Sequence, residues 1–261
     1  MRSALVVLVV AAGCGRFGFD SHGSADGSLA DGSGVPGDDA DAPDDGAAVG
    51  CSSAFDLCDD FEAPALNAAI WATDPMVSLD TARAHRGSQS VHIHMPAFAP
   101  NTGNYQTLGE TQTSASSTTF WVRAWFWLSA LPASGNGLEL MTAEQPGFAG
   151  DYVFVFSDST HVYSQFDLSS MSAMTPVPIG TWFCVVWKVV RSTASSGSLE
   201  ISGDVPALAL GDIQTDSASN PITLVTLGMG FAGSNTPSAQ PALDLWIDDV
   251  IAHSAPVSCA E

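Results

Sequence analysis

The sequence predicts an all-β fold, a two-sheet antiparallel jelly-roll sandwich. Short apolar runs recur at a spacing of about ten residues, and Gly, Pro, Ser and Asn separate them. Helical periodicity is almost absent, and a turn around residues 63–70 is its only candidate. One domain over residues 51–261 accounts for all of these runs, since a chain of 261 residues is long enough to bury a sizeable core.

The clearest strand covers residues 120–128, FWVRAWFWL. Because successive side chains of a strand point to opposite faces, one face of this segment is apolar. That face carries Phe120, Val122, Ala124, Phe126 and Leu128, and the opposite face carries Trp121, Arg123, Trp125 and Trp127. Further segments with strand character are residues 151–156, 161–166, 181–190, 198–202, 222–231 and 243–252.

The N-terminus predicts export. Arg2 precedes an apolar run that is too short to span a bilayer as a helix, and small residues lead to Cys14. This pattern resembles a bacterial lipobox, which implies a signal peptide over residues 1–14 and a lipid anchor on Cys14. Gly15 follows the cysteine, where an aspartate would indicate retention in the inner membrane. We therefore expect the outer membrane or cell surface. An ordinary secretory signal is the alternative.

A linker and an acidic charge balance follow. Residues 15–50 are rich in Asp, Gly, Ser and Ala, so we expect a disordered acidic linker. The whole chain has 28 acidic against 7 basic residues, a formal net charge of −21. This balance excludes nucleic acid as a partner, and it leaves the lipid anchor as the only expected contact with a membrane.

Four cysteines remain when Cys14 is set aside: Cys51, Cys58, Cys184 and Cys259. An even number in an exported chain predicts two disulfides, with three possible pairings. A zinc site is less favoured, because the chain contains no Cys-x-x-Cys pair.

Several short motifs suggest a family. They are LCDDFE (57–62), RGSQSVHI (86–93), TWFCVVW (181–187) and WIDDVIA (246–252). In this order they resemble the concanavalin A-like, laminin G-like jelly roll. TWFCVVW is similar to a strand of pentraxin-type domains, and WIDDVI is similar to the last strand of laminarinase-like glycosidases. That fold hosts both binding proteins and enzymes, so the resemblance does not decide between them.

A candidate catalytic pair is Glu139 and Glu144 in the segment LELMTAE. The spacing resembles the Glu-x-Asp-x-x-Glu motif of family-sixteen glycoside hydrolases, but Met141 stands where that motif has Asp. On a regular strand, residues five apart point to opposite faces. Only a β-bulge would bring both carboxyls to one side. Because Met141 replaces the Asp that the mechanism uses, we expect no hydrolysis of β-glucans.

The sequence suggests two other candidate ligand sites. A lyase site would combine His161, Tyr163 and Gln165 on one strand face with Arg123 nearby, although the acidic domain would repel an anionic polymer. Trp125, with its neighbouring tryptophans, is a candidate for stacking on sugar rings. Packing in the core is the alternative for these tryptophans.

The resemblance also implies a structural Ca²⁺ between the first and last strands, because laminarinase-like domains often hold one there. Asp248 matches the last-strand ligand, and Asp60 and the carbonyl of Gly87 are the other candidates. Carboxylate and carbonyl oxygens suit this ion. The alternative is two solvated acidic edges.

We therefore expect a surface lipoprotein with a non-catalytic glycan-binding or adhesion domain. The alternatives are a polysaccharide-active enzyme, either a glycoside hydrolase or a lyase, and a purely structural surface protein. The two carboxyls discriminate between the first two, because an enzyme needs Glu139 and Glu144 to converge.

Overall fold

A computed structural model describes residues 51, 54–110, 119–144, 150–164, 169–190, 197–203, 208–213 and 224–260. The described residues belong to one compact unit. The predicted signal peptide with Cys14, the predicted linker and Gln165 lie outside the described residues.

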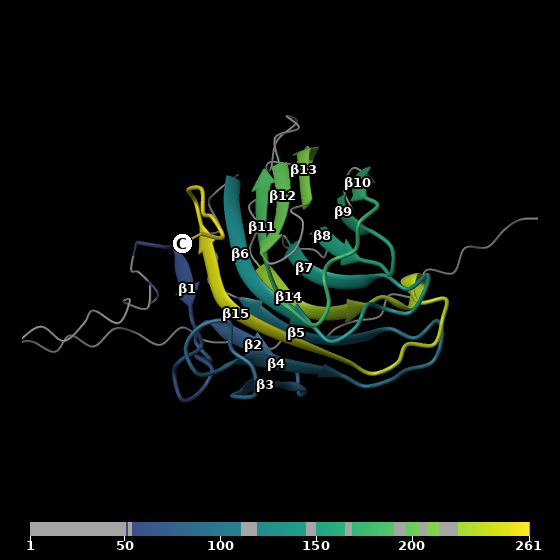
Figure 1. Cartoon of the computed structure of the whole chain (residues 1–261), viewed down its shortest axis with the longest axis horizontal. Helices are drawn as coiled ribbons and strands as arrows, with labels where there is room; N and C mark the ends of the chain where they lie inside the picture. Colours follow the sequence, from purple (N-terminus) through teal and green to yellow (C-terminus); the bar gives the residue numbers. More distant parts are fainter. Residues whose placement is uncertain are drawn as a thin grey trace, which may run out of the picture. The chain divides into compact units, whose positions relative to one another are not determined.

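The described residues form two antiparallel sheets, as predicted (Figure 1). The eight-stranded sheet, here called sheet A, contains β1, which pairs with β15 at one side. The other strands run in the order β13 (Leu208–Ile213), β12 (Gly197–Gly203), β11 (Trp182–Val190), β6 (Thr119–Leu128), β15 (Leu243–His253), β4 (Ser90–Met95) and β3 (Val77–Asp80), and β1 is Leu57–Asp59.

The seven-stranded sheet is here called sheet B. Its order is β10 (Ser169–Ala173), β9 (Thr160–Ser164), β8 (Gly150–Val155), β7 (Leu138–Glu144), β14 (Leu224–Phe231), β5 (Asn104–Glu110) and β2 (Trp71–Thr73). The only helical element among the described residues is a short 3-10 helix, η1 (Gly233–Asn235).

The apolar core lies between the sheets, and strand β6 shows how the sequence builds it. All five side chains of its predicted apolar face are buried in the core. The opposite face of β6 lies on the outer side of sheet A. The alternation therefore predicted both the strand and its buried face, and the jelly-roll sandwich is confirmed.

Strand β15 keeps its apolar side chains in the core by means of a β-bulge. Leu245 and Ile247 are buried in the core, and after the bulge Val250 takes up the same role. The register against β6 shifts after Asp248. Asp249, inside the bulge, has φ of 48°, a left-handed conformation that a bulge accommodates.

Both predicted disulfides form, and the structure decides the pairing. Cys51 bonds to Cys58, and Cys184 on β11 bonds to Cys259. The second bond joins residues 75 apart in the sequence and fixes the C-terminal segment on sheet A. Two disulfides indicate an exported protein. Among the described residues, no helix is long and apolar enough to cross a membrane.

Candidate functional site

A β-bulge in β7 brings Glu139 and Glu144 to the same face of sheet B. Against β8, Glu139 lies opposite Phe154 and Met141 lies opposite Val153, so Leu140 is the additional residue. Leu138 and Leu140 are buried in the core before the bulge, and Met141 and Ala143 are buried after it. The side chains that remain, Glu139, Thr142 and Glu144, therefore share the outer face.

Paired residues on neighbouring strands extend this face across the sheet. Gly230 on β14 lies opposite Glu139 on one side and opposite Tyr105 of β5 on the other. On the far side of Glu139, the row continues through Phe154 to His161. The next row runs through Thr142, Tyr152 and Tyr163. Residues far apart in the sequence thus form one continuous surface.

Aromatic rings cover much of this surface, and we call the set the aromatic face. Its ring centroids lie 5.7 Å apart between Tyr152 and Phe154, and 6.3 Å apart between Tyr152 and Tyr163. The ring of His161 lies 4.7 Å from that of Phe156. Tyr105, across the two carboxyls, is 46% exposed. The aromatic face consists of Tyr105, Tyr152, Phe154, Phe156, His161 and Tyr163.

Gly230 allows Tyr105 and Glu139 to approach each other. A Cβ atom at this position would lie 2.9 Å from the ring of Tyr105 and 3.1 Å from the Cβ of Glu139. Both distances are shorter than ordinary van der Waals contact, so a side chain here would push the two neighbours apart. The glycine keeps the carboxyl next to an aromatic ring.

The carboxyls are partly withdrawn from water. Burial, with a smaller effect of the Glu144 charge, raises the pKa of Glu139 to about 7. Burial also raises the pKa of Glu144. The pKa of Tyr105 rises to about 12, through burial first and then through both glutamates. Near neutral pH, Glu139 therefore exists in both protonation states.

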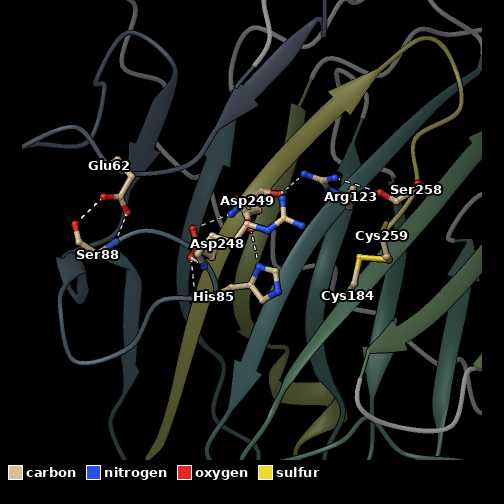
Figure 2. Close-up of polar contacts among 10 residues, drawn as sticks. Glu62, His85, Ser88, Arg123, Cys184, Asp248, Asp249, Ser258 and Cys259 are labelled. Carbon is tan, nitrogen blue, oxygen red and sulfur yellow. Dashed lines mark hydrogen bonds and ion pairs between the residues drawn. A yellow bond between two sulfur atoms is a disulfide. The ribbon is translucent and has the colours of Figure 1, made fainter. Parts of the chain in front are cut away.

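The predicted lyase site is not assembled. Arg123 lies on β6 of sheet A and is only 4% exposed, whereas His161 and Tyr163 lie on β9 of sheet B. The guanidinium of Arg123 donates to the carbonyl of Ser258 at 3.1 Å (Figure 2). Because their strands belong to different sheets, Arg123 cannot join the two other residues. Of the predicted set, His161 and Tyr163 belong to the aromatic face.

Trp125 lies on the outer side of sheet A, as the alternation predicted, but another ring covers it. The imidazole of His85 stacks on Trp125 with centroids 3.6 Å apart and an angle of 14° between the planes. The neighbouring Trp127 is covered similarly by the guanidinium of Arg83, 3.7 Å from its ring. A sugar ring would have to displace these side chains to stack on the tryptophans.

Asp248 is fully buried at the bulge of β15, and backbone amides satisfy it. One carboxyl oxygen accepts the amides of His85 at 2.7 Å and Arg86 at 3.3 Å, and the other accepts that of Asp249 at 2.9 Å. Figure 2 shows the carboxyl held between the loop and the strand. Burial, followed by the charge of Asp249, raises the pKa of Asp248 to about 7.

The other predicted calcium ligands, Asp60 and Gly87, follow strand β1 and the amide of Arg86, both of which contact β15. Strand β1 does pair with β15, as the resemblance implied. The carboxyl of Asp60 accepts the amide of Glu62, and Gly87 lies in a loop that the carboxylate of Glu62 holds through Ser88. Within the described ranges, no group of three or more His, Cys, Asp or Glu could hold a metal. The calcium ion at Asp248 therefore stays a prediction.

No protein-family model matches the sequence, and no curated protein sequence matches it. Solved structures do match. The cellulose-induced protein Cip1 is 20% identical with a TM-score of 0.59, over 78% of this chain and 99% of that one. An endo-β-1,4-glucuronan lyase from the fungus Trichoderma reesei is 13% identical with a TM-score of 0.53, over 79% of this chain and 93% of that one. The binding domain of a serotype D/C botulinum neurotoxin is 13% identical with a TM-score of 0.50, over 72% of this chain and 44% of that one. At these identities the likeness establishes a shared β-sandwich fold.

Proposed function

We propose that the protein binds a carbohydrate across the aromatic face of sheet B. The main support is that six aromatic side chains lie around two carboxyls on one side of the sheet. Five of them come from β5, β8 and β9, and Phe156 follows β8. Aromatic faces pack well against the apolar faces of sugar rings. Carboxyl and phenol oxygens accept or donate the hydrogen bonds that sugar hydroxyls need.

The comparisons support a carbohydrate as the ligand. One similar structure is named as a cellulose-induced protein, and another as a lyase of β-1,4-glucuronan. The fold alone does not determine function, so the proposal depends on the aromatic face.

Removing a central ring tests the binding site. Tyr152→Ala should weaken binding to the best ligand on a glycan array by about tenfold, because it removes the ring beside Phe154 and Tyr163. Trp121→Ala is the matched control, since Trp121 lies on the outer side of sheet A. Equal affinity of the two variants and the wild type would show that the ligand binds elsewhere.

A polysaccharide-cleaving enzyme is the second candidate, and the bulge in β7 favours it. Glu139 and Glu144 share one face, and burial together with the Glu144 charge raises the pKa of Glu139 to about 7. In a hydrolase, Glu139 would protonate the glycosidic oxygen while Glu144 acts as base or nucleophile. Met141, which stands where the hydrolase motif has Asp, is buried in the core and contributes no carboxyl to the site. Thr142 is the residue that lies between the two glutamates on the outer face.

If Glu139 is the acid, its activity has a defined pH dependence. Release of reducing ends from β-linked glucans should fall as the pH rises through about 7, because Glu139 then loses the proton it must donate. Glu139→Gln should abolish the release. No release by the wild type over this pH range would leave binding without catalysis.

Attachment to the outer membrane by a lipid on Cys14 completes the proposal. The two disulfides support export, and the lipobox resemblance supports the anchor. A Cys14→Ser variant should move from the detergent phase to the soluble exported fraction. If the variant still partitions with the membrane, an acylated Cys14 is not the anchor.

Calcium binding at Asp248 rests on the resemblance alone. The prediction requires the melting temperature to rise with added Ca²⁺ and to fall with a chelator, since an ion that binds the folded state stabilises it. Asp248→Asn should remove this response. An unchanged melting curve in chelator would mean that the three backbone amides suffice for the buried carboxyl.

A further inference from the structure

The described basic side chains all lie away from the aromatic face. Arg83 stacks over Trp127, and Lys188 lies 5.5 Å from the centroid of the Trp121 ring, on the outer side of sheet A. Arg86 lies 3.9 Å from the carboxylate of Asp249, and Arg123 is buried beneath the C-terminal segment. Among the described residues, the only side chain of the aromatic face that can become a cation is His161. Burial lowers its pKa.

The carboxyls of Glu139 and Glu144 also lack partners among the residues that the structure describes. In the described part of the chain, neither carboxyl forms a hydrogen bond or an ion pair. Both are half-buried, and the rings around them offer little solvation. A carboxyl that is partly removed from water without a donor is destabilised, so donors from a ligand would relieve this cost.

These two observations determine which charge the ligand can carry. A uronate polymer would bring further carboxylates to a surface that has two carboxyls and no Lys or Arg among the described residues. A ligand with ammonium groups would supply the missing donors and the missing positive charge together. A neutral glycan would supply donors only.

We infer that the aromatic face selects a polymer of amino sugars with free amino groups, which Glu139 and Glu144 bind as ammonium ions. This inference rests on the proposed carbohydrate-binding function and names its ligand class. The rings pack against the sugar faces, and the two glutamates on β7 pair with amino groups along the polymer.

Calorimetric titration of the full chain in non-ionic detergent tests the inference. The probes are β-1,4-linked oligomers of matched length: fully deacetylated chitosan, cello-oligosaccharide and glucuronan. At a pH where the chitosan amines are protonated, chitosan should bind about tenfold more tightly than the neutral oligomer, because its ammonium groups favour the ionised form of both glutamates and pair with it. The glucuronan oligomer should bind most weakly.

A variant pair separates the site from the overall charge of the chain. Replacement of both carboxyls, Glu139→Gln with Glu144→Gln, should reduce the ratio of the neutral to the chitosan Kd to about one, because two neutral amides no longer attract ammonium ions. Glu200→Gln on β12 of sheet A is the control, and it should leave the ratio near ten. A net charge of −21 attracts any polycation, so an equal loss in both variants would overturn the inference.

The remaining outcomes distinguish the inference from the proposed function. If cello-oligosaccharide or glucuronan binds as tightly as chitosan and Tyr152→Ala weakens that binding, the inference is wrong and carbohydrate binding stands. If no oligomer binds, the inference is wrong, and the glycan array then decides whether the proposed function stands. If the double replacement prevents folding, either single replacement, Glu139→Gln or Glu144→Gln, is compared with Glu200→Gln, so the site is still separated from the overall charge of the chain.

Discussion

Four apolar side chains of β7 stay in the core although they do not alternate regularly along the strand. Leu138 and Leu140 precede an additional residue step, and Met141 and Ala143 follow it. A regular strand would expose one of these two pairs to water, at a cost of about 1.5–3 kcal/mol for each large side chain. The bulge avoids that cost, and it places both glutamates on the outer face as a consequence. The candidate site therefore depends on the packing of the opposite side of its own strand.

Strand β15 contains a second bulge next to carboxylates, but with the opposite chemical outcome. Three backbone amides donate hydrogen bonds to the buried carboxyl of Asp248. Glu139 and Glu144 receive no such donors from the described residues. A carboxylate satisfied by the backbone stabilises a loop, whereas an unsatisfied one on an aromatic surface is available to a ligand. The two bulges thus differ in whether the described residues supply hydrogen-bond donors to the carboxyl.

The sequence was sufficient for the fold and insufficient for the site, for reasons that particular residues show. Regular alternation in residues 120–128 identified both the strand and its buried face. The same rule placed Glu139 and Glu144 on opposite faces, because nothing in the local sequence predicts the bulge in β7. Arg123 and His161 were considered together, and only the strand order shows that they belong to different sheets. The aromatic face was missed apart from His161 and Tyr163, although the segment DYVFVF places Tyr152, Phe154 and Phe156 on one side.

The disulfide between Cys184 and Cys259 has a further consequence for a protein exposed to proteases outside the cell. Strands β12, β13, β14 and β15 all lie between these two cysteines in the sequence. A single cut in any loop of that stretch leaves both fragments covalently joined, and their strands still pair within the two sheets. A nicked molecule would therefore keep its mass under non-reducing conditions and its sheets in place. Proteolytic damage to these loops would remain hidden until the bond is reduced.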